Sequence, residues 1–236
     1  MRQALLLISR RYDFHSMTPQ DPVRQAPQNV VGRLSLYRRL LDEHPRSSGE
    51  HIYSHQLAQL AGVSPAQVRR DLMSISVTGS PSRGYRAQDL VRSIEFELDS
   101  PDAQLVVLIG VGFLGQALLS YVQGRRSKLV ISAAFDVDRE KVDRFFGGCR
   151  ARSMEDLESV LLEQDIRTAI LTVPVASAQE VSDRLVRAGI RGILNYAPVR
   201  LRVPDCVYVE DLDMTMALER VAYFARRRSV TEGDAR

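Results

Sequence analysis

Apolar residues recur at helical spacing soon after the start of the chain. The apolar positions between Val31 and Leu41 are three or four residues apart, which predicts a first helix that ends before Pro45. The preceding residues 1–27 contain proline-bearing dipeptides without sustained periodicity, so we expect a flexible leader there. Regular structure should therefore begin near residue 28.

Two short helices joined by a tight turn are predicted next. Ser54 begins the first of them and Gly62 ends it. Residues 64–67 then place a serine N-cap, a proline at the first helical position and a glutamine three residues after the cap, so the second helix starts at Pro65 with a capping box. This arrangement is typical of a helix-turn-helix, whose second helix enters the major groove of DNA.

The hydrophobic pattern changes character after the helix-turn-helix. Glycine and proline interrupt a strand-like stretch over residues 74–85, which predicts a β-wing, and a linking helix is expected over residues 87–98. After Ala103, short β-rich apolar runs alternate with helical stretches, and this alternation predicts right-handed βαβ crossovers in a parallel sheet. The predicted strands are 105–109, 129–135, 168–173, 192–195 and 206–209, with helices from about residues 113, 139, 154 and 176, and a last helix over 214–226.

The predicted fold class is α/β, with an N-terminal winged helix-turn-helix followed by a doubly wound, Rossmann-type sheet. The expected segments are a leader 1–27, a winged-helix DNA-binding domain 28–100, a dinucleotide-binding domain 101–212, a C-terminal helix 213–228 and a tail 229–236.

Composition narrows the class of protein. The 236-residue chain is 44% hydrophobic, as ordinary globular folds are. Its apolar runs, such as Leu105–Ile109, are far shorter than the ~20 residues of a membrane span, and the N-terminus lacks a signal-peptide core, so we expect no membrane association and a cytoplasmic location. Cys149 and Cys206 are far apart and lack metal-ligand spacing, so we expect reduced, structural cysteines and no metal site.

Charge is unevenly distributed along the chain. Residues 27–92 contain nine Arg and five Asp or Glu, a balance of +4, whereas residues 93–236 contain nineteen basic and twenty-two acidic residues, a balance of −3. The basic excess coincides with the predicted helix-turn-helix, as expected if that part meets DNA phosphates, although a solvated basic face is the alternative. The candidate DNA contacts are Ser54, Gln67, Arg69, Arg70 and Arg83.

A glycine-rich motif lies between the first strand of the predicted sheet and the helix after it. The motif is Gly110-Val111-Gly112-Phe113-Leu114-Gly115, and this position between strand and helix is the context of a dinucleotide-binding fingerprint. The first glycine permits the tight turn, the second lets the backbone approach a pyrophosphate, and the third lets the helix pack on the strand.

Asp136 ends the second strand of the predicted sheet, where a carboxylate can accept hydrogen bonds from the ribose hydroxyls of a dinucleotide. Its charge would repel a 2′-phosphate, so NAD or NADH is the expected ligand. Arg139 and Lys141 lie nearby in the sequence, which leaves NADP open. A glycine turn without any ligand is the other interpretation of the motif.

Residues suited to acid–base catalysis are missing from the expected nicotinamide end. All four histidines precede the dinucleotide domain, and the two lysines, Lys128 and Lys141, bracket its second strand. Tyr196 and Cys206 are formally possible, but the chain has no substrate domain of useful size. Binding without turnover is the simpler interpretation, with no catalytic residues. A small NAD(H)-dependent oxidoreductase and a regulator that responds to another nucleotide are the alternatives.

Several stretches together resemble the Rex family of redox-sensing repressors, from Gly32 to Phe224. Besides the glycine motif, they are Arg33-Leu34 with Tyr37, Leu57-Ala58, Gly62-Val63, Gln67–Leu72, Ala134–Asp138, Thr172-Val173-Pro174, Ala188–Pro198 and Glu210–Asp213. The resemblance implies that Thr172, Val173, Pro174 and Asn195 join the cofactor-binding residues.

The resemblance also implies an assembly and a mechanism. It implies a homodimer that binds a pseudo-palindromic operator when NAD is high and leaves it when NADH binds, with the C-terminal helix swapped between the partner's two domains. An Arg of the first helix, a Tyr after the glycine loop and an Asp beside the swapped helix couple redox state to domain angle in this family. The matching residues here are Arg39, Tyr121 and Asp213, and an ordinary interface ion pair beside a packed tyrosine is the alternative.

Two stretches depart from the family pattern. Met73-Ser74-Ile75-Ser76 stands where the family has Ser-Tyr-Phe-Gly, and the wing has Pro81 where an Arg is usual, with Arg83 displaced toward Tyr85. These departures predict an altered operator preference or weaker DNA binding.

Overall fold

A computed structural model describes residues 27–43, 50–122 and 128–233 and divides the chain into one unit that ends at Asp99 and a second that begins at Ser100. This division lies beside the boundary predicted near residue 100. Except for Pro27, the predicted leader lies outside the described residues.

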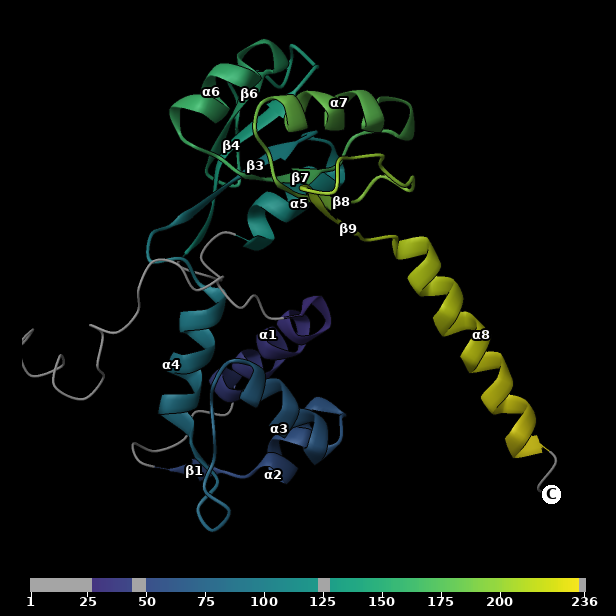
Figure 1. Cartoon of the computed structure of the whole chain (residues 1–236). Helices are drawn as coiled ribbons and strands as arrows, with labels where there is room; N and C mark the ends of the chain where they lie inside the picture. Colours follow the sequence, from purple (N-terminus) through teal and green to yellow (C-terminus); the bar gives the residue numbers. More distant parts are fainter. Residues whose placement is uncertain (1–26, 44–49, 123–127, 234–236) are drawn as a thin grey trace, which may run out of the picture. The chain divides into compact units, whose positions relative to one another are not determined.

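The first unit is a small helical domain (Figure 1). Its helices are α1 (Gln28–Glu43), α2 (Ser54–Ala61), α3 (Pro65–Ser74) and α4 (Ala87–Leu98), and two short antiparallel strands, β1 (His51–Ile52) and β2 (Tyr85–Arg86), pair beside them. One core of fully buried side chains joins all four helices and includes Leu34, Tyr37, Leu57, Leu72, Leu90 and Ile94. The predicted starts of α2, α3 and α4 agree with this structure.

The turn between α2 and α3 has the predicted Gly62 and Ser64 caps, but the side chain of Gln67 does not complete the predicted capping box. Gly62 ends α2 in the left-handed conformation (φ 66°), and the Ser64 hydroxyl accepts a 3.1 Å hydrogen bond from the Gln67 N–H. A complete capping box would also have the Gln67 side-chain oxygen accept from the Ser64 N–H, and the described bonds of Gln67 are different ones. The Gln67 side-chain oxygen instead accepts a 2.7 Å hydrogen bond from Arg70 Nη2, while its side-chain nitrogen donates to the buried Asp71 carboxylate at 2.7 Å.

The wing contains less strand than its sequence pattern predicted. Within the predicted stretch 74–85, α3 continues to Ser74, Ser80 and Gly84 form an isolated antiparallel bridge, and β2 begins only at Tyr85. The partner of β2 is β1, which the sequence pattern did not predict. Gly84 permits this pairing, because its φ is +71° and an added Cβ would lie 2.5 Å from the Ile52 carbonyl oxygen.

The second unit contains a seven-stranded sheet in the order β5-β6-β4-β3-β7-β8-β9. The strands are β3 (Gln104–Ile109), β4 (Leu129–Asp136), β5 (Phe145–Phe146), β6 (Cys149–Ser153), β7 (Thr168–Leu171), β8 (Gly192–Asn195) and β9 (Tyr208–Asp211). All neighbours pair in parallel except β5 with β6. Leaving β5 aside, the order is 3-2-1-4-5-6 along the chain, the order of a doubly wound dinucleotide-binding sheet, which confirms the predicted fold class.

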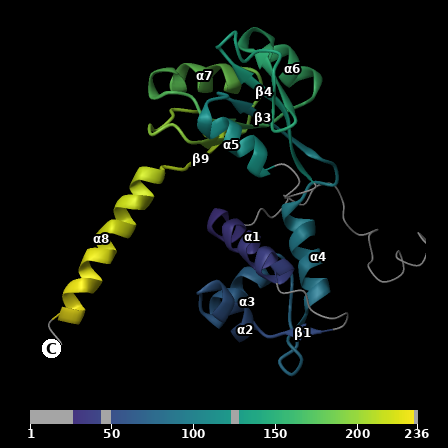
Figure 2. The same cartoon turned by 180° about the vertical axis from the view of Figure 1, so that it is seen from behind.

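Helices cover both faces of this sheet (Figures 1 and 2). On one face, α6 (Leu157–Glu163) and α7 (Val175–Arg187) pack on alternate side chains of the strands, including Val107, Ile109 and Phe135. On the other face, α5 (Phe113–Val122) places Leu119 against the intervening Val106 and Leu108. The switch point of the sheet therefore lies between β3 and β7, where strand order reverses.

One predicted element of the second unit was wrong, and another is shifted along the chain. The helix expected from about Arg139 is replaced by turns and by the β5–β6 hairpin, because Gly147 (φ 52°) and Gly148 (φ 79°) supply a two-residue turn that a helix cannot contain. The last strand lies two residues later than predicted, because Val207 is held by the turn at Pro204. A 3-10 turn (Met154–Asp156) precedes α6.

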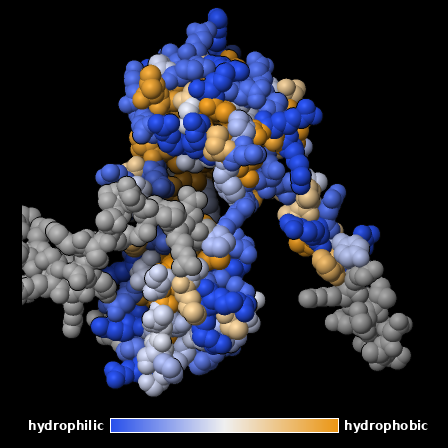
Figure 3. Space-filling view, in the orientation of Figure 1, coloured by the Kyte–Doolittle hydropathy of each residue, from blue (hydrophilic) through white to orange (hydrophobic). Residues whose placement is uncertain are grey.

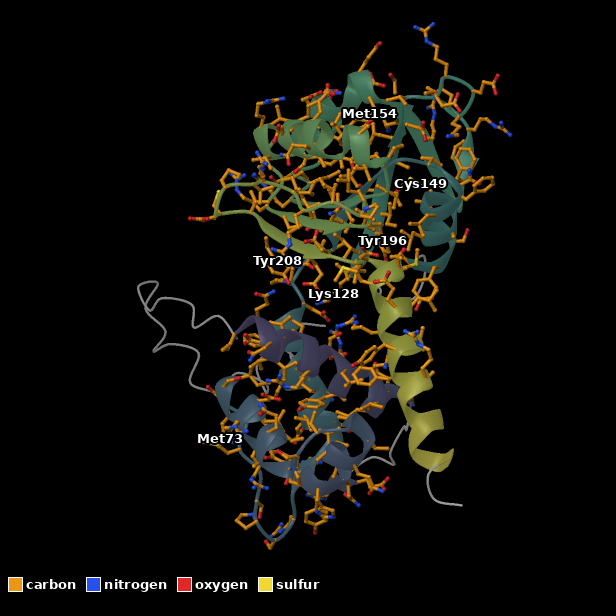
Figure 4. The ribbon with its side chains drawn as sticks, turned by 90° about the vertical axis from the view of Figure 1, so that its right-hand side faces the viewer. Met73, Lys128, Cys149, Met154, Tyr196 and Tyr208 are labelled. Atoms are coloured by element: carbon orange, nitrogen blue, oxygen red, sulfur yellow. The ribbon has the colours of Figure 1, made fainter. Side chains whose placement is uncertain are left out.

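The last helix, α8 (Met214–Gly233), is longer than expected. The predicted tail from residue 229 continues as helix to Gly233, because the sequence holds no helix breaker before that glycine. Cys149 is buried in the sheet domain (Figure 4), whereas Cys206 is exposed, and both are free thiols. Within the described ranges, the helices are too short or too polar to cross a membrane.

Candidate functional site

The glycine motif forms a loop between β3 and α5 whose three glycines differ in their surroundings. Gly110 adopts φ +97°, and an added Cβ would lie 2.6 Å from the Thr172 carbonyl oxygen. At Gly115 an added Cβ would lie only 2.0 Å from the Gly110 carbonyl oxygen. At Gly112, by contrast, it would meet nothing within 4 Å. The loop therefore has two glycines that the fold requires and one beside open space, where a pyrophosphate could approach the backbone.

Asp136 lies at the end of β4 and holds this loop. Its buried carboxylate accepts hydrogen bonds from the Val111 N–H (2.7 Å, to Oδ2) and from the Asp138 N–H (2.9 Å, to Oδ1). Lys141 approaches the same Oδ2 at 3.2 Å and the Asp138 carboxylate at 3.5 Å. Although burial alone would lower the pKa of Lys141, its hydrogen bonds and charge interactions with the two carboxylates raise it. Asp136 thus fixes the loop, and its predicted contact with the ribose hydroxyls of a dinucleotide stays a prediction.

The remaining predicted cofactor residues lie along the same carboxyl edge of the sheet. Thr172 follows β7, and its hydroxyl lies 2.7 Å from the Gly110 carbonyl oxygen, to which it donates. Pro174 precedes α7 and is exposed, while Val173 and Leu114 are partly exposed. Phe113 is almost fully exposed at the start of α5 (98%), an unusual setting for a phenylalanine in an isolated chain.

Asn195, at the end of β8, differs from these residues because it is only 1% exposed. Its amide donates to the Val199 carbonyl oxygen (2.9 Å) and the Asp211 carboxylate (2.8 Å), and its oxygen accepts from the Ala197 N–H (3.0 Å). The predicted cofactor contact stays a prediction, and the described contacts are all within the protein.

In the first unit, a buried carboxylate organises the second helix of the helix-turn-helix, α3. Asp71 is 1% exposed and receives both Nε (2.6 Å) and Nη2 (2.8 Å) of Arg33 and the hydroxyl of Tyr37 (2.8 Å), two residues of α1. It also receives the Gln67 amide (2.7 Å), whose oxygen accepts from Arg70 Nη2 (2.7 Å). A chain of hydrogen bonds therefore runs from α1, through Asp71 and Gln67, to the exposed Arg70 of α3.

The charge state of this group follows from its contacts. Burial alone would raise the pKa of Asp71, but hydrogen bonds from Arg33, Tyr37 and Gln67, with the charge of Arg33, outweigh it and the pKa is lowered. Burial of the phenol is the main cause that raises the pKa of Tyr37, and the hydrogen bond to Asp71 raises it further. At neutral pH the group is therefore a carboxylate held by an arginine and a neutral phenol.

The other candidate DNA contacts lie on the outer surface of the same unit. Arg69 of α3 donates to the Ser54 hydroxyl at the start of α2 (3.2 Å), so these two predicted residues lie together. Arg83 is exposed in the turn of the wing. Met73 also lies on the surface of α3, 64% exposed (Figure 4), at one of the positions that departs from the Rex pattern.

The predicted coupling residues are distributed over both units. Arg39 of α1 is exposed and lies 3.6 Å from Glu43, while Tyr121 of α5 is 58% exposed. Asp213 caps α8, because its Oδ1 accepts from the N–H groups of Thr215 (2.8 Å) and Met216 (3.0 Å). The family role assigned to these three residues stays a prediction.

Sequence reasoning missed two ion pairs of the first unit that each contain a buried charged residue. It singled out neither Asp71 nor Arg33 for a role, nor Arg38, whose buried guanidinium lies 2.7 Å from Asp99. A signal was available, since a charged residue among the apolar positions of an amphipathic helix needs a partner. The sequence could not name that partner, because Asp71 and Arg33 are 38 residues apart.

Comparison with known families supports both halves of this structure. Residues 25–72 match a family described as "Putative DNA-binding protein N-terminus", and residues 102–199 match one described as "CoA binding domain". The redox-sensing transcriptional repressor Rex of Syntrophobacter fumaroxidans is 39% identical over 84% of this chain and 94% of its own, and that of Bacillus subtilis is 36% identical over 87% and 95%.

This chain belongs to the Rex family. The resemblance inferred from the motifs is thereby confirmed, as is the expectation of a transcription regulator and not an enzyme. Among solved structures, the Rex-family repressor RSP in complex with β-NAD⁺ and operator DNA is 29% identical, with a TM-score of 0.79 over 88% of this chain and 95% of that one. RSP in complex with β-NADH has a TM-score of 0.77 at 28% identity, over 90% and 99% of the two chains.

Proposed function

We propose that this Rex-family chain is a cytoplasmic homodimer that binds operator DNA when NAD fills the glycine-loop site and releases the DNA when NADH replaces it. Its relatives are named as redox-sensing repressors, and RSP has been crystallised with NAD⁺ and operator DNA and with NADH. The observation that carries the proposal in this chain is the glycine loop held by Asp136 at the switch point of the sheet.

The dinucleotide would lie across the carboxyl ends of β3, β4 and β7. The open space at Gly112 fits a pyrophosphate, and the N–H groups at the start of α5 would face its charge. Asp136 and Asp138 with Lys141 leave a net charge of −1, from two carboxylates and one ammonium, so a 2′-phosphate is disfavoured. We therefore expect NADH to bind more tightly than NADPH. Phe113, Thr172, Val173 and Pro174 are the proposed neighbours of the ligand.

DNA would be bound by α3 and the wing. Arg69 and Arg70 project from α3 and Arg83 from the wing, while Gln67 and Ser54 each hold one of the α3 arginines. Guanidinium groups held by neighbouring side chains lose less conformational freedom when they bind phosphates or base edges. The affinity should fall steeply with salt because these cations displace counterions.

The dimer would be formed by α8. Its described side chains from Met214 to Arg226 are all exposed, and the first turns show apolar groups on the surface (Figure 3). Met214, Leu218 and Val221 are 62%, 67% and 65% exposed and recur at the spacing of one helical face. An apolar helical stripe of this kind is stabilised by burial against another surface, which fits the swapped helix implied by the family.

The decisive experiment is an operator-binding titration with the full-length chain. A gel shift across genomic fragments isolates a retained duplex, and fluorescence anisotropy then measures its affinity at fixed salt with NAD, NADH, NADPH or coenzyme A. We expect release at lower concentrations of NADH than of the other three. Absence of any specifically retained fragment, with or without NAD, would contradict the repressor function, and sustained oxidation of NADH would indicate an oxidoreductase instead.

A further inference from the structure

Asn195 joins the carboxyl edge of the sheet to the start of α8. Its side chain donates to the Asp211 carboxylate of β9, and its backbone oxygen accepts from the Leu212 N–H at 2.8 Å. The partners of Asn195 in both bonds, Asp211 and Leu212, belong to the three residues that precede α8. The helix itself begins on the cap made by Asp213.

The hydrogen-bond partners of the Asn195 amide fix its orientation. Its nitrogen faces two oxygens, those of Val199 and Asp211, and its oxygen faces the Ala197 N–H, so a flipped amide would lose all three bonds. A buried amide with every bond satisfied is rigid. It therefore holds the loop after β8 and the end of β9 as one piece.

The same edge is connected to the glycine loop. The Thr172 hydroxyl donates to Gly110, and the Tyr196 N–H donates to the Leu171 carbonyl oxygen at 2.9 Å, beside the β7–β8 pairing of Leu171 with Asn195. Hydrogen bonds between neighbouring segments, joined by adjacent residues of the chain, thus connect the loop through the ends of β7 and β8 to the start of α8. Tyr196, the residue after Asn195, is marked in the sheet domain in Figure 4.

We propose that the Asn195–Asp211 bond is a positioning element that transmits dinucleotide occupancy from the glycine loop to α8. This inference rests on the proposed function, because it assumes that α8 responds to the ligand. Asn195 then acts through α8 and not as a ligand contact. Asp211 is the informative residue to change, since it is exposed and its removal leaves the two loop bonds of Asn195 in place.

The test compares three variants of the full-length chain. Asp211→Ala removes the acceptor, Asp211→Asn keeps an acceptor oxygen without the charge, and Asp205→Ala removes an exposed carboxylate of the preceding loop as the matched control. The quantity measured is the ratio of the operator Kd with NADH to that with NAD. We expect Asp211→Ala to reduce this ratio about two- to tenfold, the value of one hydrogen bond, whereas Asp211→Asn and Asp205→Ala should stay within about twofold of the unmodified protein.

Two further measurements separate positioning from binding and from folding. NADH affinity without DNA should change less than about twofold in Asp211→Ala, and hydrogen exchange at the Leu212 N–H should become faster. An unchanged ratio in Asp211→Ala, or a loss that parallels NADH affinity, would overturn the inference. A ratio of one in the unmodified protein would instead overturn the proposed function.

Discussion

The two units of this chain hold their functional residues by different means. In the first unit, the side chains of α3 are oriented by hydrogen bonds to the buried carboxylate of Asp71. In the second, the buried Asp136 carboxylate holds the glycine loop, and backbone contacts in addition leave no room for a Cβ at Gly110 or Gly115. The functional helix of the first unit is thus held by side-chain hydrogen bonds, whereas the glycine loop needs both a buried carboxylate and two positions without a side chain.

The largest expected effect comes from removing the buried charge. Asp71→Ala leaves the partners Arg33 and Tyr37 without their acceptor, and breaking such a pair costs about 3 kcal/mol of unfolding free energy. Chemical denaturation followed by circular dichroism should show the helical unit unfolding earlier. The control is Asp89→Ala. The Asp89 carboxylate is exposed and lies 3.7 Å from Arg86, so its removal should lower the unfolding free energy by at most about 1 kcal/mol. Equal effects of the two substitutions would contradict the role of Asp71.

A smaller effect is expected from adding one carbon to the loop. Gly115→Ala forces a Cβ against the Gly110 carbonyl oxygen and should destabilise the second unit by about 1–3 kcal/mol. Gly112→Ala meets open space, so the melting temperature should hardly change while NADH affinity falls, because the new methyl group lies where the pyrophosphate would approach. Calorimetry with NADH and thermal melting check the pair. Unchanged NADH affinity in Gly112→Ala would contradict the placement of the pyrophosphate beside Gly112.

The smallest effect is confined to acid. Because the folded-state pKa of Asp71 lies below its ordinary value of 3.8, its carboxylate stabilises the first unit above that value, and the contribution is lost as the pH falls through the folded pKa. The difference in stability between the unmodified protein and Asp71→Asn should therefore be constant near neutrality and shrink in strong acid. Denaturation curves from pH 7 downward measure it. A difference that grows on acidification would contradict the lowered pKa.

The sequence predicted the elements whose signals are local. The capped start at Ser64, the left-handed turn at Gly62 and the strand before Gly110 lie where the pattern placed them. The pattern failed where a choice depended on distant partners. The segment after Asp136 looked helical, but the Gly147-Gly148 turn and the pairing of β6 with β4 made it a hairpin.

Features whose signals lie within a few residues could be inferred from the sequence: the fingerprint of the glycine loop, the carboxylate at the end of the second strand of the sheet and the basic helix-turn-helix. Periodicity, capping and glycine conformation act over a few residues, so they can be inferred from order alone. That Arg33 bonds to Asp71 and Asn195 bonds to Asp211 became clear only in the folded structure, because such contacts depend on which strands and helices become neighbours when the core forms.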